Sequence, residues 1–126
     1  MTIQEAIERV CRAEPNTFSP IEMTEWLSRL DMEIWRETAG AHEDAALKEF
    51  KGYSGETDLD TPLIVPPPDD LGIYLNYLEA EIHLRNHEIG RYNQSIALFN
   101  DAMARYENRY NAEHLPLSKV RAFRFK

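Results

Sequence analysis

The chain has 126 residues, of which 43% are apolar, and its formal net charge is −8. This length suits a single domain with one modest core, and the apolar share excludes wholesale disorder. The acidic balance argues against a protein that wraps nucleic acid by neutralising phosphates. A single cysteine excludes an internal disulfide, and no run of eighteen apolar residues predicts a transmembrane helix.

The first predicted helix begins at a capping box, with Thr2 as the N-cap residue and Glu5 at N3, and it ends near Ala13. Cys11 lies on its apolar side, where we expect a buried, unreactive thiol. The N-terminal sequence lacks the basic start and apolar run of a signal peptide, so we expect the protein on the cytoplasmic side. The predicted buried face comprises Ile3, Ala6, Ile7 and Val10.

A second capping box predicts the start of the next helix, with Ser19 as the N-cap residue and Glu22 at N3. Pro20 occupies the first helical position, where its missing N–H costs nothing. Gly40 marks the predicted end of this helix. Its predicted buried face comprises Met23, Trp26, Leu27, Leu30 and Ile34.

The middle of the chain carries loop signals followed by a short apolar run. The second half of residues 41–62 is rich in glycine, serine and acidic residues, which indicates a loop. Residues 63–65 are apolar but precede three prolines, which argues against a central strand, so we expect an extended segment laid on the helices. Asp69 or Asp70 then caps the following helix.

Residues 71–110 have the most regular apolar pattern and predict two helices that meet at Gly90. We expect Gly90 to be the C′ residue of the first helix, with Asn93 or Ser95 capping the second; one uninterrupted, kinked helix is the alternative. The first stripe comprises Leu71, Leu75, Leu78, Ile82 and Ile89. The second stripe, over about five turns, comprises Tyr92, Ile96, Phe99, Met103, Tyr106 and Tyr110.

A second apolar line runs along a neighbouring face of the first of these two helices. It consists of Ile73, Tyr77, Ala80 and Leu84. A helix with two apolar faces has two surfaces to pack against. One is its partner helix, and the other is either the N-terminal helices or another subunit. We therefore predict Ile73, Tyr77 and Leu84 as subunit-interface residues.

The last residues differ from the rest of the chain in charge and pattern. Four basic residues stand against Glu113 alone in residues 111–126, so a basic tail follows an acidic body. Residues 119–126 alternate basic with apolar, which is typical of a strand. Because a helical body has no sheet for it, we expect this strand to pair with another chain. The predicted docking residues are Lys119, Val120, Arg121, Phe123, Arg124 and Phe125.

These patterns predict an all-α fold with a small four-helix bundle and a long C-terminal helical hairpin. We expect residues 1–112 to form this helical domain and residues 113–126 to form an extended docking tail. The sequence contains no phosphate-binding glycine loop and no nucleophile elbow. Its best metal-ligand spacing is Glu79, His83 and His87 on one helical face, but two such histidines are far more often solvated or at an interface.

The chain also resembles a known family. A proline-rich segment, an acidic pair and a tyrosine- and leucine-rich helix lead into Glu-Ile-Gly-Arg-Tyr-Asn at residues 88–93. Phe99-Asn100 and a tyrosine-rich helix ending near His114 follow. In these features residues 63–114 resemble the head–tail connector (adaptor) proteins of tailed phages and prophages.

This resemblance implies a structural virion protein, not an enzyme, that is assembled in the host cytoplasm and located at the virion neck. Similar proteins are small helical bundles that form a ring, usually dodecameric, beneath the portal and extend the DNA channel. The implied partners are the portal protein, neighbouring copies and the next neck or tail-completion protein. DNA would pass without specific binding, since an acidic channel repels phosphates. No cofactor, metal or membrane is implied.

Two other hypotheses belong to different classes. The first is a small helical scaffolding or regulatory module that binds a partner protein through its C-terminal tail. Portal and capsid genes upstream would favour the adaptor over this module. The second is an enzyme that uses His83 and His87 with Glu79, and it has the weakest support from the residues.

Overall fold

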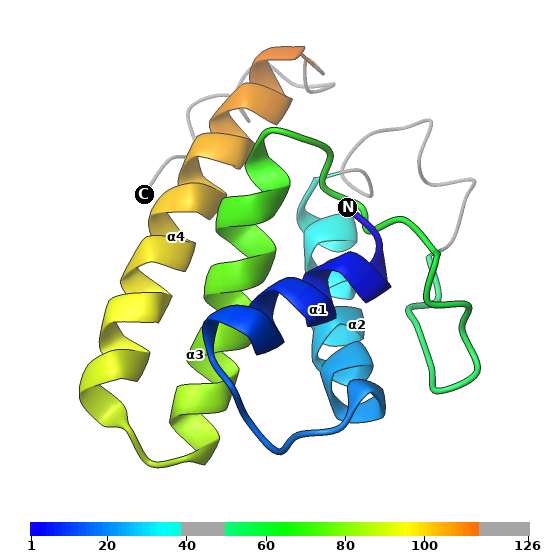
Figure 1. Cartoon of the computed structure of the whole chain (residues 1–126). Helices are drawn as coiled ribbons and strands as arrows, with labels where there is room; N and C mark the ends of the chain where they lie inside the picture. The colour runs from blue at the N-terminus through cyan, green and yellow to red at the C-terminus, as the bar shows by residue number, and fades with distance from the viewer. Residues whose placement is uncertain (39–49, 114–126) are drawn as a thin grey trace.

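The computed structural model describes residues 1–38 and 50–113, which form an all-α fold (Figure 1). β-Pairing within these ranges is limited to an isolated bridge between Thr2 and Pro62. None of the helices described is both long enough and apolar enough to cross a membrane. The elements are α1 (Ile3–Ala13), α2 (Pro20–Glu37), the π-helical turn η3 (Leu71–Leu75), α3 (Asn76–Arg85) and α4 (Ile89–Glu113).

Both predicted capping boxes are present at the helix starts. The hydroxyl of Thr2 accepts a hydrogen bond from the Glu5 amide, and the Glu5 carboxylate accepts one from the Thr2 amide. Ser19 and Glu22 repeat this exchange at the start of α2. These bonds satisfy N–H groups that the first turn of a helix leaves free. Both helix starts are therefore fixed by residues within four positions of one another.

The segment before the prolines lies on the helices, as predicted. The amides of Ile3 and Gln4 donate to the carbonyls of Thr61 and Leu59, so this segment satisfies further free donors of α1. Leu63 and Val65 are buried in the core. The remaining core residues come from α1 and α2 (Ile3, Ala6, Ile7, Val10, Met23, Trp26, Leu27, Leu30, Ile34), from η3 and α3 (Ile73, Tyr74, Leu78, Ile82) and from α4 (Ala102, Tyr106).

A π-helical turn changes which residues of the 71–85 segment face the core. Asp70 caps this turn, its side chain accepting from the Leu71 amide at 2.8 Å. A π turn bonds residue i to i+5, so it shifts the face that later residues share. Ile73 and Tyr74 are fully buried as a result, whereas Leu71 is exposed. The predicted stripe is therefore wrong at its first residue, and it is also wrong at its last, because Ile89 is exposed.

The turn between α3 and α4 lies earlier than predicted. His87, with φ 61°, occupies the left-handed C′ position that we assigned to Gly90. The Glu88 amide donates to the His83 carbonyl at 2.8 Å and the His87 amide to the Leu84 carbonyl at 3.1 Å, which is a Schellman motif. Gly90 lies inside α4, which begins at Ile89, so Asn93 and Ser95 are not N-cap residues.

The helices α3 and α4 pack as antiparallel neighbours, and α1 and α2 pack beside them. Figure 1 shows α3 and α4 running side by side in opposite directions, with α1 crossing in front of α2 and α3. The π-helical turn η3, which leads into α3, also approaches α4 closely, because a Cβ added at Gly72 would lie 3.3 Å from Ala102 Cβ. Arg85 stacks its guanidinium over the Trp26 ring at 4.4 Å, which joins α3 to α2.

Candidate functional site

A buried carboxylate joins α2 to the proline segment and η3. Asp31 is fully buried and accepts hydrogen bonds from the Tyr53 hydroxyl, from the Tyr74 hydroxyl at 2.7 Å and from the Ile64 amide at 3.2 Å. The Tyr74 hydroxyl in turn accepts from the Val65 amide at 2.9 Å. This network holds the residues that immediately precede the prolines against α2.

Burial dominates the electrostatics of this network. Desolvation raises the pKa of Asp31 above its ordinary value, although the three hydrogen bonds oppose the rise. Burial, followed by the neighbouring Asp31 charge, raises the pKa of Tyr53 and of Tyr74. Both phenols therefore stay protonated near neutral pH and act as hydrogen-bond donors. The network has the chemistry of a structural clamp.

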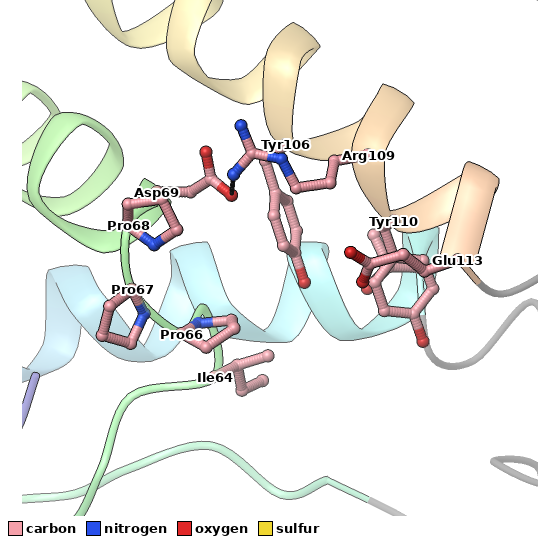
Figure 2. Close-up of a pocket in the computed structure, with 10 residues that line it drawn as sticks. Ile64, Pro66, Pro67, Pro68, Asp69, Tyr106, Arg109, Tyr110 and Glu113 are labelled. Atoms are coloured by element: carbon pink, nitrogen blue, oxygen red, sulfur yellow. Dashed lines mark hydrogen bonds and ion pairs between the residues drawn. The ribbon is translucent and has the colours of Figure 1, made fainter.

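A pocket of about 370 Å³ lies beside this clamp, between the prolines and the end of α4. Figure 2 shows Arg109 reaching across from α4 to Asp69, with 2.6 Å between the guanidinium and carboxylate atoms. Burial raises the pKa of Tyr106, on the pocket wall, to about 12. The lining residues are Thr38, Ile64, Pro66, Pro67, Pro68, Asp69, Tyr106, Arg109, Tyr110 and Glu113.

This hollow, which we call the proline pocket, is suited to binding. Proton transfer by Tyr106 is disfavoured, because its raised pKa keeps the phenol protonated near neutral pH. Proline and tyrosine rings form apolar walls, and the Asp69–Arg109 pair supplies both a carboxylate and a guanidinium at the mouth. Such a combination accepts an apolar side chain and orients polar groups next to it. Nearly all of its lining lies within residues 63–114, the part of the chain that carries the family resemblance.

A second hollow, of about 330 Å³, lies between α2 and α4. We call it the acidic groove, because Glu33, Glu37 and Glu107 all line it. Glu33 and Glu37 are exposed on α2, whereas the apolar side chains between the two helices are buried or half-buried. The apolar lining consists of Leu30, Ile34, Phe99 and Met103, and Asn100 and Ala104 complete the groove.

The apolar stripe of α4 is only partly covered by the rest of the described chain. Of its six predicted residues, only Tyr106 is buried, and the other five are half-buried. Phe99 packs against Tyr77 of α3 with 5.5 Å between ring centroids. Leu98, beside the stripe, is 58% exposed. A 25-residue helix with this much accessible apolar surface has room for a further neighbour.

The three predicted interface residues occupy different environments. Ile73 is 0% exposed and packs in the core of its own chain, so its prediction as a subunit-interface residue is wrong. Tyr77 is half-buried against Phe99, and burial followed by the Glu81 charge raises its pKa to about 12. Leu84 is 41% exposed. The predicted docking residues Lys119, Val120, Arg121, Phe123, Arg124 and Phe125 lie outside the described residues, as does Gly40.

The histidine pair on α3 is divided by the turn. His83 is buried, and its Nδ1 lies 2.8 Å from Oε1 of Glu88, across the turn. His87 is exposed in the turn itself. In residues 1–38 and 50–113, no three His, Cys, Asp or Glu side chains gather in a way that could hold a metal ion. Cys11 is partly buried, and Asn16 Nδ2 lies 3.7 Å from its sulfur.

Our sequence reasoning missed Asp31 and the acidic groove. Asp31 carried a detectable signal, because it lies four residues after Leu27 and three before Ile34, in phase with the buried face of α2. The groove had no local signal, since its walls come from helices more than sixty residues apart. No family model, curated protein or solved structure matches the chain.

Proposed function

We propose that this protein is a structural head–tail connector of a tailed phage or prophage. In this proposal its copies form a ring at the virion neck, below the portal, and extend the channel through which DNA passes. The chain would act as a four-helix bundle with α3 and α4 as its C-terminal hairpin, followed by a docking tail over residues 113–126. The proposed role is assembly, without catalysis or a cofactor.

The observation that carries this proposal is the partly covered apolar stripe of α4. Five of the six stripe residues remain half-buried in the single chain, on a helix of 25 residues. Exposed apolar surface of this kind marks protein–protein contact sites. Packing between neighbouring copies in a ring would cover it. Leu84 and Tyr77, on the adjacent α3, are accessible enough to extend the same contact.

The family resemblance supports this choice among assemblies. Its proline-rich segment, which leads into Asp69, and its tyrosine-rich helix are distant in sequence but adjacent in space, where they line the proline pocket (Figure 2). If this chain docks in the same way as the connector proteins that it resembles, the residues that carry the resemblance should form one surface. The charge supports it as well, because an acidic body avoids adhesion to DNA inside a channel.

Co-sedimentation with the portal protein of the same genome tests this proposal. The full chain should sediment with assembled portal. A Phe123→Asp/Phe125→Asp chain should stay in the supernatant, because a tail without its apolar contacts, whether to the portal or to a neighbouring copy, cannot hold the ring in place. A Phe123→Leu/Phe125→Leu chain is the matched control and should still sediment. Circular dichroism must show equal helix content for all three. If the full chain fails to sediment with portal, the connector proposal is wrong.

A further inference from the structure

The acidic groove has negative charge at its edge and apolar side chains at its base. Glu33 and Glu37 are exposed on α2, one turn apart, and neither forms an ion pair with another residue of the described ranges. Ile34, between them in sequence, is almost fully buried at the base. The groove therefore suits a ligand with cations next to apolar groups, at a spacing set by one helical turn.

The C-terminal segment of this protein has that chemistry. Residues 119–126 hold four basic residues and no acidic one. In an extended chain, residues two apart lie on the same side, about 6.6 Å from each other. Phe123 and Phe125 would thus share one side, and Arg124 and Lys126 would share the other. One turn of α2 separates Glu33 from Glu37 by about 6 Å of rise, which matches the cation spacing.

We propose that the acidic groove binds residues 119–126 of a neighbouring copy, so that each tail ties one subunit of the ring to the next. The two phenyl rings would enter between Ile34 and Met103, while the long basic side chains reach back to the carboxylates at the edge. This inference rests on the proposed ring, which brings a second copy next to each groove. It also chooses the neighbour over the portal as the acceptor of the tail.

The described residues indicate how such a tail would be recognised. Apart from the isolated Thr2–Pro62 bridge, the backbone described here is helical or in loops, with no sheet edge to extend. Strand addition is therefore not available on the part of the neighbour that the structure describes. Recognition would depend on apolar and ionic side-chain contacts, so it should weaken with salt and with charge reversal.

Disulfide cross-linking of full-length chains tests the proposal. One chain carries Ala104→Cys in the groove and the other carries Ala122→Cys in the tail, both with Cys11→Ser. Mixed under mild oxidation, with and without portal, they should form a cross-linked dimer, since a disulfide requires Cα atoms within about 7 Å. A chain with Glu25→Cys, on α2 outside the groove, is the control and should not cross-link to the tail.

Charge reversal gives the second arm of the same experiment. Glu33→Lys/Glu37→Lys in the groove chain should lower the cross-linked fraction about tenfold, as expected for the loss of two partly exposed ion pairs. Arg124→Glu/Lys126→Glu in the tail chain should restore it. The cross-linked fraction can recover only if the groove and tail charges pair directly. If Glu33→Lys/Glu37→Lys had merely destabilised the groove, reversing the tail charges would not restore the cross-link.

Two results would overturn the inference. They are a cross-link that the Glu25→Cys control forms equally well, and no cross-link between the groove cysteine and the tail cysteine. Sedimentation of the full chain with portal is a separate readout. If it persists without a cross-link, the tail–groove contact is wrong and the connector stands. If a cross-link forms without portal binding, the connector is wrong and the contact between copies stands.

Discussion

The Tyr74 hydroxyl donates a 2.7 Å hydrogen bond to Asp31 Oδ1, joining residues 43 positions apart in the chain. The same hydroxyl accepts from the Val65 amide at 2.9 Å. One phenol therefore connects η3, α2 and the extended segment that leads into the prolines. Because the proline pocket lies directly beyond this segment, its shape depends on a contact buried in the core.

Tyr74→Phe tests this clamp. The substitution keeps the ring but leaves the Val65 amide buried without its acceptor, so we expect the free energy of unfolding to fall by about 1–3 kcal/mol. Urea denaturation followed by circular dichroism measures it. Tyr92→Phe, on the half-buried stripe of α4, is the matched control and should change stability by less than about 0.5 kcal/mol. Equal effects of the two substitutions would contradict the clamp.

Asp31→Asn should remove one component of the pH dependence of stability. Burial raises the folded-state pKa of Asp31, so the folded state binds this proton more tightly than the unfolded state does. The resulting stability is fully present below the unfolded-state pKa, about 3.9. It is lost as pH rises from there through the raised folded-state pKa. Stability relative to Asp31→Asn should thus decline with pH above about 4, and a pH-independent difference would refute this assignment.

Two glycines should respond to alanine in opposite directions. Gly52 has φ 81°, and an added Cβ would lie 2.5 Å from Ser28 Oγ, so Gly52→Ala should cost about 1–3 kcal/mol of stability. Gly90 lies in α4 with open space around it, so Gly90→Ala should stabilise by about 0.4–1 kcal/mol. Thermal and urea unfolding measure both. A destabilising Gly90→Ala would mean that Gly90 terminates α3 after all.

Ile73 and Leu84 should separate folding from assembly. Ile73→Ala creates a cavity in the core, so we expect a loss of about 2–5 kcal/mol in unfolding free energy. Leu84→Ala removes a side chain that is 41% exposed and should cost less than about 1 kcal/mol. Urea denaturation at a concentration that keeps the chain monomeric distinguishes them. Similar losses for both would contradict the different environments of these residues.

Local signals predicted the helix starts but not the contacts between helices. Thr2 with Glu5 and Ser19 with Glu22 act within one turn, so their residue types alone identified them. The turn at His87 was missed because glycine tolerates a positive φ far more readily than histidine, which drew the prediction to Gly90.

Distant packing decided the remaining features. The π turn shifts the face of the helix that packs in the core, and no apolar period in the sequence indicates this shift. For this reason the sequence predicts Ile73 at a subunit interface, whereas it is buried in the core. The proline pocket lies between the prolines and α4, and the acidic groove lies between α2 and α4. Their residues were visible in the sequence, but their juxtaposition depends on how the helices pack against one another.

Electron microscopy of the full chain mixed with its portal protein tests the connector most directly. We predict an additional ring of density, coaxial with the portal and attached to its tail-facing end, that is absent from portal alone. Its symmetry should match that of the portal, with α4 of each copy against a neighbour. Portal particles without added density, at a chain concentration that saturates sedimentation assays, would contradict the connector role.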